Sequence, residues 1–232
     1  MKIFKNYVLI VPATLLILGT TYLSITSLST VMASINFYGA KNYIEQWQAD
    51  KDVNNDDLAS AYLNARKAAE RHENHPLYTD TLSTILQYKA LSNSDYNDSM
   101  RLLNEAEAEN WKSALNRPAW PVTWANIAYV RWLKGEVNTE LIQYMTKASE
   151  LGPHTPEVHL AVAEIGLGMS KRYVRTFLSN KDIVKKHTLL GLRHPKTKNK
   201  IANIIANTKT QSLVCTWFTQ EETSIVKVLK CA

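Results

Sequence analysis

The chain has 232 residues, with 27 Lys and Arg against 21 Asp and Glu, and its net charge is +6. This length suffices for a membrane anchor and one domain of ordinary size. A basic chain could bind nucleic acid. The N-terminal segment described next predicts export from the cytoplasm, which excludes that partner.

An uncharged, mostly apolar segment covers residues 7–31, which is long enough to cross about 30 Å of hydrocarbon as a helix. Lys2 and Lys5 precede this segment, and the first charge after it is Lys41. The positive-inside rule then places the N-terminus in the cytoplasm. We therefore predict a single-pass anchor at residues 1–33 in a bacterial inner membrane, with the remaining domain in the periplasm.

The end of the same segment also fits a signal peptidase site. Val31-Met32-Ala33 has the small-residue pattern of such sites. The apolar segment is longer than a typical signal-peptide core, and its second half is rich in Ser and Thr. We favour a retained anchor over a cleaved signal peptide, and the domain is translocated in either case.

Helical patterns fill the chain after the anchor. Residues 34–57 should continue as a juxtamembrane helix and then form a polar linker, with Asp56 and Asp57 capping the next helix. Three helices are predicted after this linker, at about 57–72, 76–91 and 98–115. No segment alternates apolar and polar residues long enough to require a sheet, so the predicted fold class is all-α.

Residues 117–163 carry the clearest helix-turn-helix pattern. Pro118 and Pro121 suit a helix entry, and Gly135 interrupts the apolar periodicity. Leu151-Gly152-Pro153 should end the second helix with a glycine that can adopt the left-handed conformation. The first helix has an apolar face formed by Trp124, Ile127, Ala128 and Trp132. Trp, Gly, Tyr, Ala and Pro in this order are typical of tetratricopeptide (TPR) repeats.

An internal echo supports stacked repeats. Lys67-Ala68-Ala69-Glu70 and Lys147-Ala148-Ser149-Glu150 lie 80 residues apart, and so do Pro76 and Pro156. We predict TPR-like helical repeats over residues 58–168, and the pattern loosens after Gly168. A basic helical region should follow over residues 169–232, with helices at 173–178, 183–192, from Pro195 through Ile205, at 211–218 and at 224–229. Such stacks offer a binding surface and usually carry no catalytic group, which favours an adaptor over an enzyme.

The segment Arg-Pro-Ala-Trp-Pro-Val-Thr-Trp-Ala-Asn at 117–126, with Leu151-Gly152-Pro153 and Leu160-Ala161-Val162-Ala163-Glu164 after it, resembles the VpsP-type exopolysaccharide biosynthesis family. The resemblance is sharpest over 117–165. It implies one N-terminal membrane anchor, an α-helical domain, and a role beside polysaccharide polymerisation and export proteins. It supplies no catalytic motif, so it indicates a pathway and leaves the mechanism open.

The C-terminal region has two further features. Cys215 and Cys231 are the only cysteines, and in an oxidising periplasm they predict a disulfide, with two buried thiols as the alternative. Residues 171–210 contain eleven Lys and Arg but one acid, Asp182. This segment could bind an anionic polymer or lipid headgroups, or it could be a solvated face.

Candidate catalytic and metal-binding groups are sparse. The histidine pairs His72/His75 and His154/His159 lack the three or four convergent ligands of a zinc site, so we predict no metal. There is no glycine-rich phosphate loop, nucleophile elbow or zinc-protease motif, and we predict no cofactor and no enzymatic activity.

The two acids of a paired-carboxylate enzyme can come from anywhere in a fold. Glu105, Glu107 and Glu109 alternate along one helix, as solvated acids do. Glu164 lies in an apolar run and is the best candidate for a buried acid, which a salt bridge or a helix cap would explain.

Five aromatic residues lie between positions 111 and 132 and could stack on sugar rings. They are Trp111, Trp120, Trp124, Tyr129 and Trp132. We expect Trp124 and Trp132 to pack in the core. Trp120, between two prolines, is more suited to exposure, and Arg117 beside it could pair with a uronate carboxylate. Arg117 and Trp120 are therefore the predicted interaction surface.

These observations favour a non-enzymatic, membrane-anchored accessory protein of exopolysaccharide or capsule biosynthesis and export, which binds other proteins of that complex. The alternative is a periplasmic TPR-like chaperone or envelope-assembly factor. A third hypothesis is an enzyme that trims or modifies the polymer.

Overall fold

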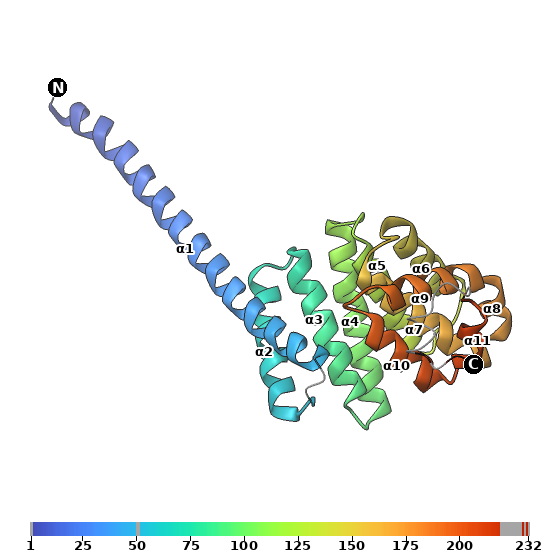
Figure 1. Ribbon diagram of the computed structural model, residues 1–232. Helices are drawn as coiled ribbons and strands as arrows, with labels where there is room; N and C mark the ends of the chain where they lie inside the picture. Colours follow the sequence, from blue (N-terminus) through green and yellow to red (C-terminus); the bar gives the residue numbers. More distant parts are fainter. Residues whose placement is uncertain (1, 50–51, 219–228, 230, 232) are drawn as a thin grey trace. The chain divides into compact units, whose positions relative to one another are not determined.

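The computed structural model describes residues 2–49, 52–218, 229 and 231. These residues form eleven helices and no strand (Figure 1), which confirms the all-α class. The chain divides into two compact units, Met1–Ile85 and Leu86–Ala232, and the division falls inside α3. The helices are α1 (Lys2–Gln48), α2 (Asn55–Arg71), α3 (Pro76–Leu91), α4 (Tyr96–Asn116), α5 (Pro121–Leu133), α6 (Thr139–Leu151), α7 (Pro156–Arg172), α8 (Val174–Ser179), α9 (Lys181–Arg193), α10 (Lys198–Thr208) and α11 (Gln211–Cys215).

Helix α1 is continuous, but its environment changes at Ala33. The large apolar side chains from Leu15 to Met32 are exposed, whereas Ala33, Phe37 and Trp47 are buried. Among the described residues α1 is the one helix that is long and apolar enough to cross a membrane. The predicted apolar N-terminal helix is thus confirmed, and it suits a signal anchor or a signal sequence.

The second half of α1 packs on α2 as an antiparallel pair. The stripe on α2 consists of Leu58 and of small residues, Ala61, Ala65 and Ala68, at spacings of three and four, which lets the two helices approach closely. The predicted cap of α2 was wrong. Asn54 is the N-cap, and its Oδ1 accepts a hydrogen bond from the backbone N–H of Asp57 at 2.8 Å.

Side-chain hydrogen bonds also join α1 to the turn between α2 and α3. Thr30 Oγ1 lies 3.1 Å from His72 Nε2, and Ser34 Oγ lies 3.1 Å from the Tyr78 hydroxyl. The ring centroids of Phe37 and Tyr78 lie 5.1 Å apart. The packed part of the first unit therefore begins where the exposed apolar segment of α1 ends, with no linker between them.

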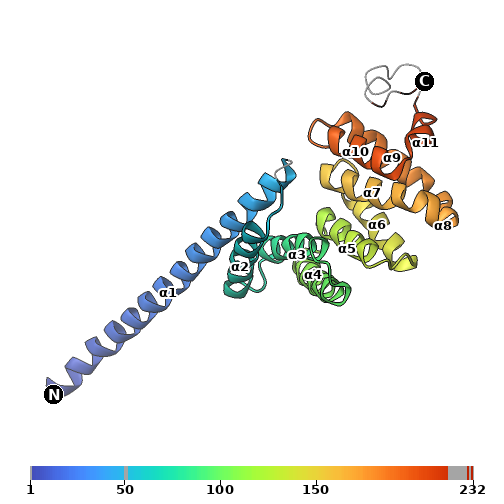
Figure 2. The same cartoon turned by 90° about the horizontal axis from the view of Figure 1, so that it is seen from below.

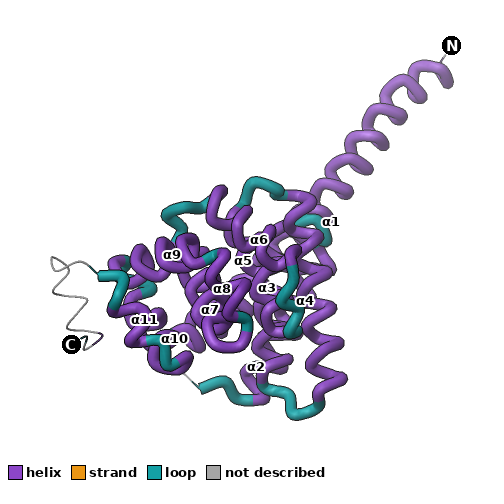
Figure 3. Tube along the Cα trace, turned by 90° about the vertical axis from the view of Figure 1, so that its right-hand side faces the viewer, coloured by secondary structure: helices purple, strands orange, loops and turns teal. Residues whose placement is uncertain are grey.

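In the second unit short loops join consecutive helices (Figure 3), and α5 and α6 form a packed antiparallel pair. Helix α7 is central, because it contacts α5, α6, α8, α9 and α10 (Figure 2). Fully buried side chains from α5, α6, α7, α9 and α10 form the core, including Ile127, Leu141, Met145, Ile165, Leu192, Ile201 and Ile205.

Two glycines in this unit have different roles. Gly135 has φ +76, so the predicted break after α5 is a left-handed residue. Gly152 ends α6 as predicted, but its φ is −133, and the expected left-handed conformation was wrong. Its lack of a side chain serves close packing instead, since a Cβ there would lie 2.5 Å from Pro121 Cβ.

Some helix boundaries in the basic region differ from the prediction. Helix α7 continues past Gly168 to Arg172. The ring of Trp132 packs against this glycine, where a Cβ would lie 2.5 Å from Trp132 Cζ2. Helix α10 begins at Lys198 and not at Pro195, since Thr197 Oγ1 donates to the Gly191 carbonyl at 2.7 Å and closes a turn. The helix predicted from Ser224 lies outside the described residues, apart from Leu229.

Candidate functional site

The predicted surface residues Arg117 and Trp120 lie together in the turn between α4 and α5. The Trp120 N–H donates to the Arg117 carbonyl at 3.0 Å, which closes the turn, and Pro121 begins α5 directly after it. The Arg117 guanidinium carbon lies 4.5 Å from the centroid of the Trp120 ring. Trp120 is 43% exposed. The two residues thus form a cation–π stack at the surface, which we call the Arg–Trp platform.

Trp124 occupies the interior side of the same helix entry. It is buried, and its Nε1–H donates to the Pro118 carbonyl at 2.7 Å. Its ring meets Trp111 edge-on at 5.7 Å and stacks with Tyr144 at 5.9 Å. These aromatic rings join α4, α5 and α6, so Trp124 packs in the core as predicted, and the turn that carries the Arg–Trp platform has a rigid base.

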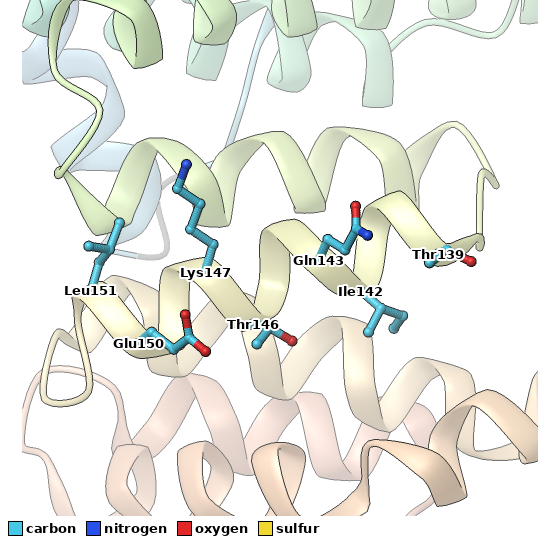
Figure 4. A pocket seen from close by; sticks show the side chains of 7 residues that line it. All are labelled: Thr139, Ile142, Gln143, Thr146, Lys147, Glu150 and Leu151. Atoms are coloured by element: carbon cyan, nitrogen blue, oxygen red, sulfur yellow. The ribbon is translucent and has the colours of Figure 1, made fainter.

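A shallow open groove of about 420 Å³ runs along one face of α6 (Figure 4). Lys147 extends from this face toward α5, where its Nζ lies 3.5 Å from the centroid of the Trp124 ring. The acidic residue Glu150 is exposed on the same face. The lining residues are Thr139, Ile142, Gln143, Thr146, Lys147, Glu150 and Leu151.

The C-terminal end of this groove lies close to the Arg–Trp platform. Leu151 is the last groove residue, and the next residue, Gly152, packs against Pro121, the neighbour of Trp120 in the chain. We call the groove and the platform together the α6 surface. Sequence reasoning found the platform but missed the groove, because spacings of three and four along α6 also fit an ordinary solvated face.

A network of ion pairs holds the other end of α5. Glu107 accepts hydrogen bonds from Arg131 Nε at 2.9 Å and from Lys134 Nζ at 2.8 Å. Burial by itself raises the pKa of Glu107, but Lys134 and Arg131 outweigh it and lower that pKa. Lys134 also pairs with Glu136 at 2.8 Å, and Arg131 pairs with Glu140.

The expectation of solvated acids on α4 was therefore wrong for two of the three. Glu107 is 8% exposed and joins α4 to α5 through its cationic partners, which lie 24 and 27 residues further along the chain. Glu109 is equally buried and pairs with Lys112 at 2.6 Å. Sequence spacing could not predict partners that only packing brings together.

Glu164 on α7 is largely buried, as its sequence context suggested. The Tyr129 hydroxyl donates to its Oε1 at 2.9 Å. Burial raises the pKa of Glu164, and burial together with the Glu164 charge raises the pKa of Tyr129. The expected salt bridge or helix cap was wrong, because the partner is this phenol. Neither residue lines the groove.

Two buried histidines form a cluster that sequence reasoning missed. His159 on α7 and His187 on α9 approach each other with 2.8 Å between their Nδ1 atoms, so one nitrogen donates and the other accepts. His187 Nε2 lies 2.7 Å from Ser149 Oγ on α6. Burial, with nearby positive groups, lowers the pKa of His159 to about 4 and that of His187 to about 3. The neutral pair thus connects three helices in the core.

The other histidine pair lies at the turn between α2 and α3. His72 and His75 have ring centroids 6.2 Å apart, and His75 stacks on Tyr78 at 3.9 Å. Within the described part of the chain no group of three or more His, Cys, Asp or Glu residues is arranged to hold a metal ion.

At the C-terminal end, Cys215 and Cys231 are joined by a disulfide with 5.6 Å between their Cα atoms. Trp217 between them is buried, and Gln211 Nε2 donates to the Leu229 carbonyl at 2.7 Å. Oxidation of this pair in the cell stays a prediction.

Comparisons with known protein families and with curated proteins found no match to the chain.

Proposed function

We propose that the protein is a non-enzymatic, membrane-anchored adaptor in a system that makes and exports an exopolysaccharide or capsule. In this proposal α1 stays in the inner membrane with the N-terminus in the cytoplasm. The helices after it form a TPR-like stack in the periplasm, which binds other proteins of the system through the α6 surface.

The exposed Arg–Trp platform is the observation that carries this proposal. A tryptophan exposed by 43% and held by a cation–π contact contributes little to the core, yet a rigid turn presents it beside an open groove. Exposed Trp and Arg are the residue types that most often dominate protein interfaces. The resemblance of residues 117–165 to exopolysaccharide biosynthesis proteins points to the pathway.

The surroundings of Ala33 support a retained anchor. Cleavage after Ala33 would remove a fully buried residue of the α1–α2 packing and make Ser34, which bonds to Tyr78, the new terminus. An uncut α1 keeps both contacts.

The double variant Trp120→Ala with Arg117→Ala tests the proposal in cells that lack the native gene. A buried Trp→Ala change costs roughly 3–5 kcal/mol and depletes a protein, whereas this exposed residue should leave the protein level unchanged. We expect a normal amount of protein and a large loss of exported polymer. Tyr96→Ala with Arg101→Ala is the matched control, because it removes an exposed aromatic ring and an exposed arginine elsewhere in the second unit.

Three other outcomes contradict the proposal. Normal polymer with both double variants would remove the Arg–Trp platform from the function, and with it the observation that carries the proposal. Normal polymer in the gene deletion, with misassembled outer-membrane or secreted proteins, would favour the periplasmic chaperone instead. Turnover of the polymer by the purified protein would show an enzyme.

A further inference from the structure

Helix α8 exposes two apolar side chains on its outer side. Val174 is 49% exposed and Leu178 is 61% exposed, and their spacing of four residues places them next to each other. Phe177, between them in the chain, is buried and fixes α8 to the core. The two apolar side chains are therefore exposed to water, and the buried Phe177 keeps α8 from turning them toward the core.

Four cations surround this pair in the chain. Lys171 and Arg172 end α7, Arg175 lies within α8, and Lys181 begins α9. None of the four forms an ion pair with another described residue. The only acid in residues 171–210 is Asp182. We call Lys171, Arg172, Val174, Arg175, Leu178 and Lys181 the α8 patch.

We propose that the α8 patch docks on the surface of an anionic phospholipid bilayer. Lipid headgroups would neutralise the cations, and the acyl boundary would take up Val174 and Leu178, as in amphipathic helices at membrane surfaces. A soluble polyanion would satisfy only the cations and leave both apolar side chains in water. The inference rests on the membrane anchor of the proposed function, but not on its adaptor role or on the α6 surface.

The apolar helix α1 makes such docking favourable. A chain held in a bilayer by α1 meets lipid at a high effective concentration, so a weak patch suffices. Each basic residue near an anionic surface contributes about a fivefold preference, which corresponds to about 1 kcal/mol.

The test uses the full chain in lipid nanodiscs that contain either phosphatidylcholine alone or phosphatidylcholine with phosphatidylglycerol. A spin label at Ser179→Cys, an exposed position of α8, reports collisions with oxygen, which enters the bilayer, and with a water-soluble nickel chelate. Without reductant the disulfide protects the native cysteines from labelling. We expect the label to enter the lipid only in discs with phosphatidylglycerol.

Two variants separate the components of the patch. Arg172→Glu with Arg175→Glu should lower the ratio of docked to undocked protein by about 25-fold or more, and Val174→Ser with Leu178→Ser should also release the label. Lys196→Glu with Lys200→Glu, which lie beyond the other end of α9, is the control with an equal change of charge and should have little effect.

A label that stays in water in both kinds of disc would overturn the proposal. So would equal release by the control pair, which would indicate a diffuse positive field. Long-chain polyphosphate could also bind to the protein in phosphatidylcholine discs. If this binding is the same in Val174→Ser with Leu178→Ser, the patch is a polyanion site instead.

Discussion

At the scale of single residues, the second unit depends on contacts that allow few alternatives. His159 and His187 share one hydrogen bond between two neutral rings, and Glu107 is satisfied only because two cations reach it. Removing one partner from such a group leaves the other buried without its bond, which costs more than the bond itself contributes. These residues should therefore control stability more than function.

The histidine pair predicts a loss of stability in acid. The folded-state pKa values of about 4 and about 3 lie below the unfolded value of about 6.5. Above pH 6.5 the pair is neutral in both states and its stabilisation is complete. As the pH falls toward 4 and then 3, both histidines become protonated in the unfolded chain while they stay neutral in the folded chain. The free energy of unfolding should decline by at most about 1.4 kcal/mol per pH unit for each histidine.

Chemical denaturation at several pH values, on the full chain in detergent, measures this decline. His187→Asn should lower stability at pH 7 and flatten the slope between pH 6.5 and 4. His72→Asn, which removes a histidine of the first unit that takes no part in this cluster, is the control and should keep the slope of the native protein. An unchanged slope in His187→Asn would contradict the prediction.

Gly152 predicts a steric cost at the end of α6. In Gly152→Ala the new Cβ would meet Pro121 at 2.5 Å and Thr155 Oγ1 at 2.7 Å, and the proline ring is too rigid to yield. We expect a loss of about 1–3 kcal/mol in unfolding free energy, as for other overpacked sites, and a lower melting temperature. Gly19→Ala, with no atom within 4 Å of its Cβ, should be neutral. Equal melting temperatures would show that α5 shifts without cost.

At the scale of helices, the end of the chain should depend on its disulfide. Cys215 closes α11, and the bond to Cys231 spans 16 residues. In the chain-entropy model, a disulfide that closes a loop of this length stabilises the folded state by about 3 kcal/mol.

Mass spectrometry of protein alkylated without reduction should therefore find neither thiol modified. Cys215→Ser with Cys231→Ser should lower the melting temperature, and reductant should destabilise the native protein but leave this variant unchanged. Two alkylated thiols in protein taken from the periplasm would disprove the bond.

At the scale of the whole molecule, the topology follows from α1. The lysines before the apolar segment and the absence of charge up to Lys41 predict a cytoplasmic N-terminus. A phosphatase fused after Ala232 should be active, because that enzyme folds only outside the cytoplasm, and a fusion to residues 1–41 should be active as well. Replacing Lys2 and Lys5 with Glu should lower both activities. An inactive C-terminal fusion at normal expression would reverse the proposed orientation.

The sequence by itself determined the helices and the apolar anchor segment. Period, caps and prolines act within a few residues, so α3 begins at Pro76 and α5 at Pro121, as predicted. The tertiary structure alone decided the partners. Glu107 with Arg131, His159 with His187, and Gly152 with Pro121 are far apart in the chain. Their contacts depend on how whole helices pack, and no local pattern encodes that. The exposed Trp120 was predictable because two nearby prolines fix its turn, whereas the groove on α6 exists only where neighbouring helices leave that face uncovered.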